Sequence, residues 1–343
     1  MASKTVLAPL TSLRFVAALL VVAHHYFRLE PGYAGVSFFF VLSGFILAFN
    51  YAPRVADRGD FWFRRFARIW PTHALTFVIA IPIGLDTTNF VGSAATAVLN
   101  LALLQSWMPQ PEIYFSFNRL SWSISNEAFY YALFPVLLAR LAGVRAATRW
   151  SIVGTWTVLL VAAAAAWFAA FGHVNPLAGP THYVWYINPA VRLFEFVLGM
   201  ALALHFLARD GRSMGLLQEV GALGFAAASL TLLPWIPPPF SLSLAFVPGW
   251  AAVVYVFACG GGPLSRALSH PVLVLLGEAS FMLYMIHELA RMYLLPGDSG
   301  TVFQRTALAV AVVAASVVLH LGFEKPVQRA LLKRRAAAAL ATP

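Results

Sequence analysis

The chain has 343 residues, of which 60% are hydrophobic and only 10% are charged. Because a soluble domain usually carries about 25% charged residues, this composition excludes an ordinary soluble protein and indicates lipid as the main solvent. The net charge of +10 lies in short clusters between long apolar runs, which is typical of topology-setting loops, so we expect no nucleic-acid partner. The single cysteine, Cys259, excludes an internal disulfide, and no Cys/His spacing predicts a metal site.

A helix that crosses the bilayer needs about 20 mostly apolar residues. Runs of this kind predict an all-α polytopic integral membrane protein with about ten transmembrane helices. The first run is too long for the core of a signal peptide, so we expect it to remain as the first span. The runs lie at 8–27, 33–52, 70–88, 122–142, 150–171, 183–206, 215–235, 240–260, 271–294 and 304–323.

A further apolar stretch at 91–108 makes the count ambiguous, and the positive-inside rule favours one solution. If this stretch is re-entrant or lies at the surface, the basic loops share one side and both termini are cytoplasmic. We expect one membrane-embedded domain, 1–343, with flexible tails at 1–7 and 336–343. The basic residues placed inside are Lys4, Arg54, Arg58, Arg64, Arg65, Arg68, Arg140, Arg145, Arg149, Arg209, Arg212, Arg266, Lys325, Arg329, Lys333, Arg334 and Arg335.

The first span carries two ionisable residues, Arg14 and His25. Ionisable groups inside spans are costly unless they are paired or hydrated, so each is a functional candidate. The two are eleven positions apart, which returns to the same helix face about 16 Å further along. Taken singly, Arg14 is equally consistent with snorkelling to the interface and His25 with an interfacial histidine.

The segment 61–71 alternates aromatic and basic residues, among them Arg64, Arg65 and Arg68, and we predict a loop at the cytoplasmic surface. Such a segment is most often a lipid-headgroup anchor. A phosphate-rich cofactor would use the same chemistry, because Arg binds phosphate oxygens in bidentate fashion. The sequence contains no Walker loop, dinucleotide-binding glycine pattern or Gly-x-Ser-x-Gly elbow.

Glu127 lies at the outer end of the span 122–142, at the depth predicted for His25. A carboxylate there would orient the imidazole and stabilise its protonated form. The alternative is an interfacial helix start with polar residues in its first turn.

Two later spans carry polar pairs or stripes. Arg192 and Glu195 have the spacing of an intrahelical ion pair, and mutual neutralisation is the simplest reason for burying both. Ser280, Tyr284 and His287 form one polar helix face. That face either lines a cavity or joins helices by hydrogen bonds.

Taken in order, these features resemble the acyltransferase-3 family of membrane O-acyltransferases. The matching segments are LRFVAALLVV with His25, GVSFFFVLSGF at 35–45, the basic segment up to Pro71, WSISNE at 122–127, and Gly277 through His287. Members include bacterial O-acetylases of O-antigen, exopolysaccharides and Nod factors, and macrolide-sugar acylases. The chain departs from the pattern at Ser37, where an aspartate is frequent, and at Phe281, where a tyrosine is common.

The resemblance implies a multi-pass enzyme of the bacterial cytoplasmic (inner) membrane. It would move an acyl group, most often acetyl, from acyl-CoA to a hydroxyl of a sugar, polysaccharide or glycosylated metabolite, without a metal. We expect no fused extracellular hydrolase-like domain. The residues implied are His25 and Glu127 in catalysis, Arg14, Arg64, Arg65 and Arg68 at the donor phosphates, and Ser123, Ser125, Tyr284 and His287 at the acceptor.

In this interpretation His25 removes a proton from the acceptor hydroxyl, and Glu127 holds its tautomer. A covalent acyl-histidine is a second route. A proton-coupled transporter of a small solute or lipid-linked sugar would also place Arg, His and Glu inside about ten spans. It does not require the ordered motifs, and no related halves are apparent. Oligomeric state is left open.

Overall fold

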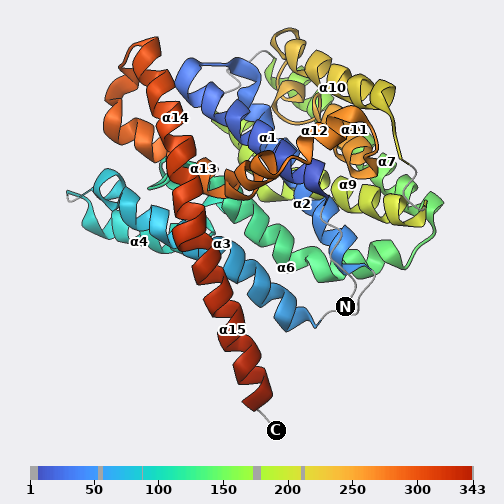
Figure 1. The fold of residues 1–343 in the computed structure, drawn as a ribbon. Helices are drawn as coiled ribbons and strands as arrows, with labels where there is room; N and C mark the ends of the chain where they lie inside the picture. The colour runs from blue at the N-terminus through green and yellow to red at the C-terminus, as the bar shows by residue number, and fades with distance from the viewer. Residues whose placement is uncertain (1–6, 53–56, 87, 173–178, 210–212, 342–343) are drawn as a thin grey trace. The chain divides into compact units, whose positions relative to one another are not determined.

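The computed structural model describes residues 7–52, 57–86, 88–172, 179–209 and 213–341 (Figure 1). Apart from one isolated bridge between Met214 and Gly261, all regular structure in these residues is helical, which confirms the all-α prediction. Lys4, Arg54 and Arg212, which the topology prediction used, lie outside the described residues.

The α-helices are α1 (Ala8–Phe27), α2 (Gly35–Tyr51), α3 (Arg58–Gly84), α4 (Phe90–Leu101), α5 (Pro111–Tyr114), α6 (Trp122–Ala142), α7 (Ala146–Phe171), α8 (Gly179–His182), α9 (Pro189–Ala208), α10 (Leu216–Thr231), α11 (Val247–Cys259), α12 (Pro263–Leu268), α13 (Pro271–Leu294), α14 (Val302–Leu319) and α15 (Lys325–Ala341). The short 3-10 and π turns are η1 (Glu30–Ala34), η2 (Gln105–Trp107), η3 (Arg119–Ser121), η4 (Tyr183–Ile187), η5 (Leu233–Trp235), η6 (Phe240–Leu242), η7 (Pro296–Asp298) and η8 (His320–Glu324).

Within the described residues, eight helical segments are long and apolar enough to cross a membrane: Ala8–Phe27, Glu30–Tyr51, Arg58–Gly84, Ala146–Phe171, Gly179–Ala208, Phe240–Cys259, Pro271–Leu294 and Val302–Ala338. The other two predicted spans correspond to α6 and α10. The 16 residues of α10 are short for a span. Helix α6 has 21 residues but carries Asn126, Glu127 and Arg140, which lower its hydropathy.

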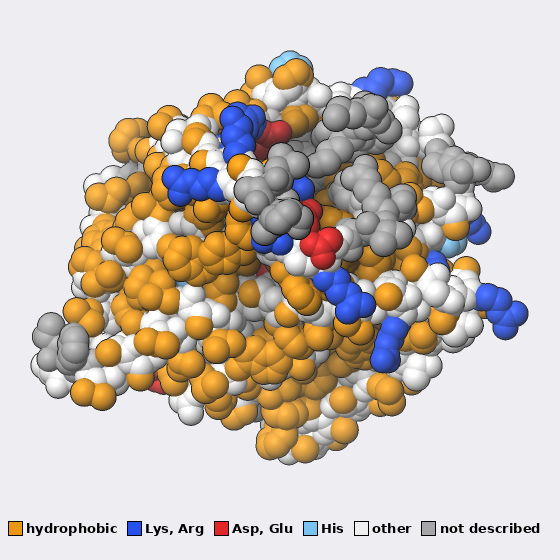
Figure 2. Space-filling model, turned by 90° about the horizontal axis from the view of Figure 1, so that it is seen from below, with side chains coloured by type: hydrophobic (Ala, Val, Ile, Leu, Met, Phe, Trp, Pro, Cys, Tyr) orange, Lys and Arg blue, Asp and Glu red, His pale blue; other side chains and the backbone are white. Residues whose placement is uncertain are grey.

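The outer surfaces of several helices are apolar. On α7, Val158 is 66% and Leu159 62% exposed, and on α14, Val310 is 65% and Val318 69% exposed. Figure 2 shows hydrophobic side chains over much of the face that it displays. Soluble proteins rarely expose apolar area on this scale, so lipid is the expected covering. These surfaces and the eight apolar helices indicate a multi-pass membrane protein.

The described chain divides into two compact units, and the first comprises Met1–His24, Leu29–Val55 and Leu133–Glu278. In this unit α2 packs along α9, and α7 and α11 pack against the pair. The α2–α9 contact depends on two glycines. A Cβ on Gly44 would collide with the backbone of Phe196, and a Cβ on Gly199 would collide with the backbone of Val41. Small residues thus allow the two backbones to touch, as in other membrane helix pairs.

The same pair of helices encloses a buried ion pair. The Arg192 side chain is fully buried, and its Nε lies 2.8 Å from Glu195 Oε1. Arg192 Nη1 donates to Tyr186 O at 2.8 Å, and Nη2 donates to Ser37 Oγ at 2.6 Å. Ser37 Oγ in turn donates to Glu195 Oε1 at 3.1 Å. The predicted ion pair is confirmed, and Ser37, one of the two departures from the family pattern, completes its network.

Replacing Glu195 with Ala should strongly destabilise the protein. The change leaves the Arg192 guanidinium buried without its counter-charge, which costs about 3–5 kcal/mol of unfolding free energy. Equilibrium unfolding in mixed detergent micelles measures the effect. The double variant Arg192→Met/Glu195→Met is the matched control, because it removes both charges together and should recover most of the loss. A single variant as stable as the wild type would contradict this account of the pair.

The second unit comprises His25–Arg28, Ala56–Ala132 and Ala279–Pro343. The prediction that residues 61–71 form a loop is wrong, because these residues lie in the first half of α3. Asp57 caps this helix by accepting hydrogen bonds from the backbone N–H groups of Gly59 and Asp60. Hydropathy placed the start of the span later because the arginines interrupt the apolar pattern. Helix α3 is therefore 27 residues long and carries the basic segment as a rigid extension of the span.

The stretch 91–108 contains α4, which has 12 residues. At 1.5 Å per residue such a helix is about 18 Å long, short of the hydrocarbon core of about 30 Å. The chain then turns at η2 and continues through α5 to α6. This geometry favours a segment that does not cross.

The last helices of the second unit form one nearly continuous rod, in which α14 continues through the π turn η8 into α15 (Figure 1). Helix α15 packs against α3. It reaches Ala341, so most of the alanine-rich tail is helical.

Candidate active site

Two histidines of the second unit, His25 and His287, are in direct contact. His25 lies near the end of α1, and His287 lies on α13. His25 Nδ1 and His287 Nε2 are 3.0 Å apart, and the ring centroids are 5.2 Å apart. The His287 side chain is fully buried, whereas that of His25 is partly exposed. The structure thus brings together two of the predicted site residues through a direct contact between their rings.

The hydrogen bonds around His287 determine which nitrogen of each ring carries the proton. His287 Nδ1 lies 3.1 Å from the carbonyl oxygen of Leu283, which can only accept, so Nδ1 is the protonated nitrogen. Nε2 of the neutral His287 ring therefore has a lone pair and accepts from the Nδ1–H of His25. The remaining lone pair of His25 is on Nε2, the position that a general base uses.

Hydrogen bonds from side chains to backbone carbonyls hold the region around His287 in place. The hydroxyl of Tyr26 donates to the carbonyl of His287 at 2.8 Å, and Asn118 Nδ2 donates to the carbonyl of Met285 at 2.9 Å. Arg305 Nη1 donates to the carbonyl of Tyr26 at 2.9 Å. These bonds come from three other parts of the unit. The position of the His287 ring is therefore determined by the fold and not by a flexible loop.

Ser123 and Tyr284 form a buried hydroxyl pair near His287. Ser123 Oγ and Tyr284 Oη are 2.7 Å apart, and they lie 3.0 and 3.3 Å from the carbonyl oxygen of Leu120. Because each hydroxyl has one proton, one of them donates to the other and the second donates to Leu120 O. The ring of Tyr284 lies 6.1 Å from that of His287. Of the three residues of the polar face on α13, Tyr284 joins this helix to the start of α6.

Ser125, also in the first turn of α6, bonds to the segment that follows α4. Its hydroxyl donates to the carbonyl of Leu103 at 2.6 Å and lies 2.6 Å from Ser106 Oγ. Both serines are buried. Ser125 therefore attaches α6 to the segment that follows α4.

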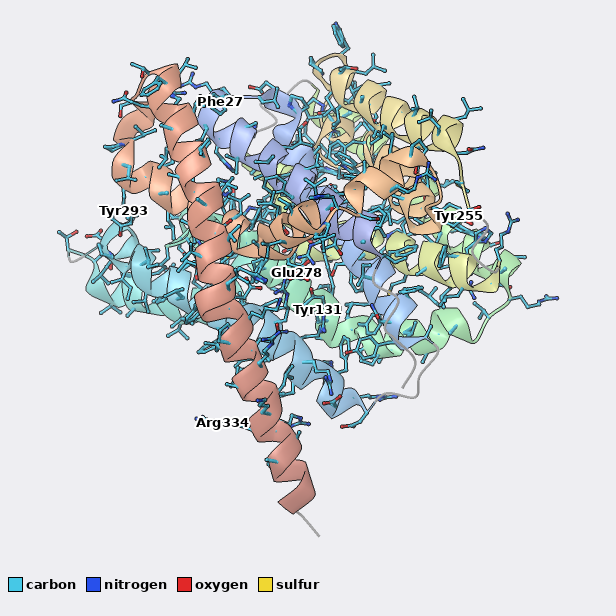
Figure 3. The ribbon with its side chains drawn as sticks, in the orientation of Figure 1. Phe27, Tyr131, Tyr255, Glu278, Tyr293 and Arg334 are labelled. Carbon is cyan, nitrogen blue, oxygen red and sulfur yellow. The ribbon has the colours of Figure 1, made fainter. Side chains whose placement is uncertain are left out.

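Glu127 is half-buried on α6 and belongs to the same unit as His25. Its Oε2 accepts from the hydroxyl of Tyr131 at 2.8 Å. The guanidinium carbon of Arg65 lies 5.9 Å from the centroid of the Tyr131 ring, and Figure 3 labels Tyr131. Tyr131 therefore contacts both Glu127, which was predicted to orient His25, and the predicted donor-site residue Arg65. His25 Nδ1 contacts His287.

The predicted donor-site arginines differ in their surroundings. Arg64 forms an exposed ion pair with Asp60 at 2.6 Å, and Arg68 pairs with the buried carboxylate of Glu324. Arg65 stacks on aromatic rings. All three lie on α3 in the second unit, whereas Arg14 is half-buried on α1 in the first. In the described part of the chain, no group of three or more His, Cys, Asp or Glu side chains is placed to hold a metal ion.

A buried polar network in the second unit was not predicted from the sequence. His73 Nε2 donates to the carbonyl of Asn100 at 2.9 Å. The amide nitrogens of Asn100 and Gln105 both donate to Ser121 Oγ, at 3.3 and 3.1 Å. All four side chains are fully buried. The sequence does contain a sign of this network, because several amide and serine residues lie between the apolar part of α4 and the start of α6.

Comparison with known proteins identifies the family. The family described as "Acyltransferase domain", Acyl_transf_3, matches residues 9–321. The chain belongs to the acyltransferase-3 family. It is 33% identical over 375 aligned positions to "Acyltransferase MdmB" of Streptomyces mycarofaciens, covering 98% of this chain and 95% of that protein. No solved structure matches the chain significantly.

More distant relatives carry provisional names. The chain is 24% identical over 356 positions to YrhL of Bacillus subtilis (strain 168), provisionally named a peptidoglycan O-acetyltransferase, with 93% of this chain and 54% of that protein covered. It is 25% identical over 312 positions to the provisionally named O-acetyltransferase SACOL0978 of Staphylococcus aureus (strain COL), with 81% and 49% covered. The chain spans about half of the length of these two proteins. The predicted acyltransferase activity is confirmed at the level of the family, and the transporter alternative is not favoured.

Proposed function

We propose that this acyltransferase moves an acyl group, acetyl in the simplest case, from acyl-CoA to a hydroxyl of a carbohydrate or glycosylated acceptor at the bacterial cytoplasmic membrane. The observation that carries the proposal is the chain of hydrogen bonds from Leu283 O through His287 to His25. These bonds place a proton on Nδ1 of each ring, so that His25 Nε2 has the lone pair that a base needs. The chain also belongs to an acyltransferase family. The names of MdmB and YrhL support acyl transfer and a glycan acceptor, respectively.

In the proposed reaction, His25 Nε2 takes the proton of the acceptor hydroxyl as the oxygen attacks the thioester carbonyl. The C–S bond then breaks, and the departing thiolate receives that proton from the imidazolium. His287 remains neutral throughout and accepts the Nδ1–H hydrogen bond, which stabilises the imidazolium and prevents ring rotation. The acyl-histidine route uses the same Nε2 lone pair as a nucleophile.

The remaining predicted residues have supporting roles in this proposal. Glu127, which accepts a hydrogen bond from Tyr131, lies in the same unit as His25, and its negative charge would stabilise the protonated form of the His25 ring. Ser123 and Tyr284 position the acceptor beside His287, and Ser125 fixes the start of α6. Each of these roles is a proposal about orientation and does not require the side chain to react.

The proposed topology places both termini, the start of α3 and α15 in the cytoplasm. Both compact units belong to one membrane-embedded domain, 1–343, and the segment 91–108 does not cross. Acyl-CoA then arrives from the cytoplasm, with its phosphates near Arg64, Arg65 and Arg68 and its acyl end directed toward His25 of the same unit. Extension of α3 as a helix before the span supports this proposal, because it presents Arg64 and Arg65 outside the apolar part of the helix.

A binding experiment tests the donor. Acetyl-CoA at 100 times its Kd should stabilise the purified protein by about 2.7 kcal/mol and raise its melting temperature. In the variant Arg64→Gln/Arg65→Gln the affinity should fall about tenfold for each charge-assisted hydrogen bond that is lost. The control Arg140→Gln/Arg145→Gln removes the same charge from exposed positions of the other unit and should keep the shift. A wild-type protein whose melting temperature does not respond to acetyl-CoA would contradict the proposal.

A further inference from the structure

The start of α3 and the whole of α15 form a pair of basic helices within the second unit. Arg68 of α3 pairs with Glu324 immediately before α15, and the Arg335 guanidinium lies 4.8 Å from the ring centroid of Phe63. Arg335 also lies beside Gly59. Residues earlier in α3 therefore contact residues later in α15, so the two helices run antiparallel. Their contact is fixed at both ends of the basic segment.

Most of the charge on α15 is not neutralised. Between residues 325 and 343 the sequence has no Asp or Glu. Within the described residues, no carboxylate forms an ion pair with Arg329, Lys333 or Arg334, and all three are exposed. Figure 3 labels Arg334 on the part of α15 that extends beyond the other helices of its unit. On α3, by contrast, Arg64 is partly neutralised by Asp60 and Arg68 by Glu324.

The length of the rod separates this charge from the lipid headgroups. A hydrocarbon core of about 30 Å accommodates about 20 helical residues, so a span that starts at Val302 ends near Leu321. Lys333 then lies about 18 Å beyond the core along the helix axis, whereas the headgroup layer is only about 5–8 Å thick. Residues at this distance meet solutes of the cytoplasm more readily than lipid phosphates.

We propose that Lys333 and Arg334 of α15, together with the arginines at the start of α3, bind the phosphate groups of acyl-CoA. This inference rests on the proposed function and extends its donor site to a second helix. Coenzyme A carries a 3′-phosphate on the adenosine as well as a diphosphate, and guanidinium and ammonium groups on two adjacent helices match a ligand with two separate anionic groups. The α15 residues are assigned to the 3′-phosphate because they lie furthest from the membrane, where the adenosine end would remain.

The test uses the double variant Lys333→Gln/Arg334→Gln in nanodiscs of neutral lipid and, as a second arm, in nanodiscs that contain anionic lipid. Arg335 is left unchanged because it packs against Phe63. We expect the KM for acetyl-CoA to rise about tenfold while kcat is preserved, and the KM for 3′-dephospho-acetyl-CoA to stay as in the wild type. The control Arg140→Gln/Arg145→Gln removes an equal charge elsewhere and should change neither value.

Three outcomes would overturn the inference. Equal KM values for variant and wild type would show that α15 does not bind the donor. An equal rise for both donors would exclude the 3′-phosphate as the group recognised. A defect seen only in nanodiscs with anionic lipid would assign α15 to lipid headgroups instead. A wild-type protein that neither binds nor uses acetyl-CoA would contradict the proposed function itself, which is a different result from a failure of α15 alone.

Discussion

Replacing His25 with Ala is expected to lower acyl transfer by about 10²–10⁴-fold, the usual contribution of a positioned general base. The variant removes His25 Nε2, the proposed base, while His287 keeps its bond to Leu283. Transfer of labelled acetyl from acetyl-CoA to membrane or glycan products, measured in membranes at matched expression, gives the size of the loss. Binding of acetyl-CoA should persist, because the donor phosphates bind elsewhere.

His24→Ala is the matched control for this experiment. The neighbouring imidazole lies on the same helix, and its Nδ1 lies 3.0 Å from the carbonyl of Leu29. It points about 100° away from His25 around the helix, so it cannot occupy the same position. We expect nearly normal transfer from this control. Equal activity of the His25→Ala variant and the wild type would remove the imidazole from the mechanism.

The second large effect is expected at His287. Replacement by Leu fills much of the volume but leaves the Nδ1–H of His25 without an acceptor, so the ring is free to change tautomer and orientation. In hydrolase triads the wrong tautomer alone lowers kcat by about 10⁴-fold, and we expect a loss of at least about 100-fold here. Steady-state kinetics should place the loss in kcat, with little change in the KM for acetyl-CoA.

A conservative variant separates positioning from packing. His287→Gln keeps an acceptor oxygen that can reach the Nδ1–H of His25, so it should recover a large part of kcat. Gln and Leu have similar packing consequences, because both remove the aromatic ring from this buried site. Equal activities of the two variants, or a loss explained by lower protein stability in both, would show that His287 has only a structural role.

The sequence predicted the helical class, most spans and the Arg192–Glu195 pair, because these depend on local spacing. It also identified His25 and His287 as candidates, but it could not predict their contact, since they lie 262 positions apart. The bond between Tyr131 and Glu127 spans four residues on one helix and was accessible from spacing alone.

The start of α3 was mispredicted for a definite physical reason. Hydropathy reports which part of a helix prefers lipid, whereas the helix itself begins where its first backbone N–H groups are capped, at Asp57. The basic segment thus has helical geometry outside the apolar window. The packing of α15 against it is a tertiary contact that no local pattern predicts.

The glycine contacts between α2 and α9 limit how this protein can move. With Gly44 and Gly199 each facing the opposite backbone, and with Ser37, Arg192 and Glu195 joined across the pair, sliding one helix along the other would break hydrogen bonds around a buried charge. These two helices should therefore behave as a single rigid body during turnover. Any rearrangement that admits substrate or releases product must come from segments that are not locked in this way.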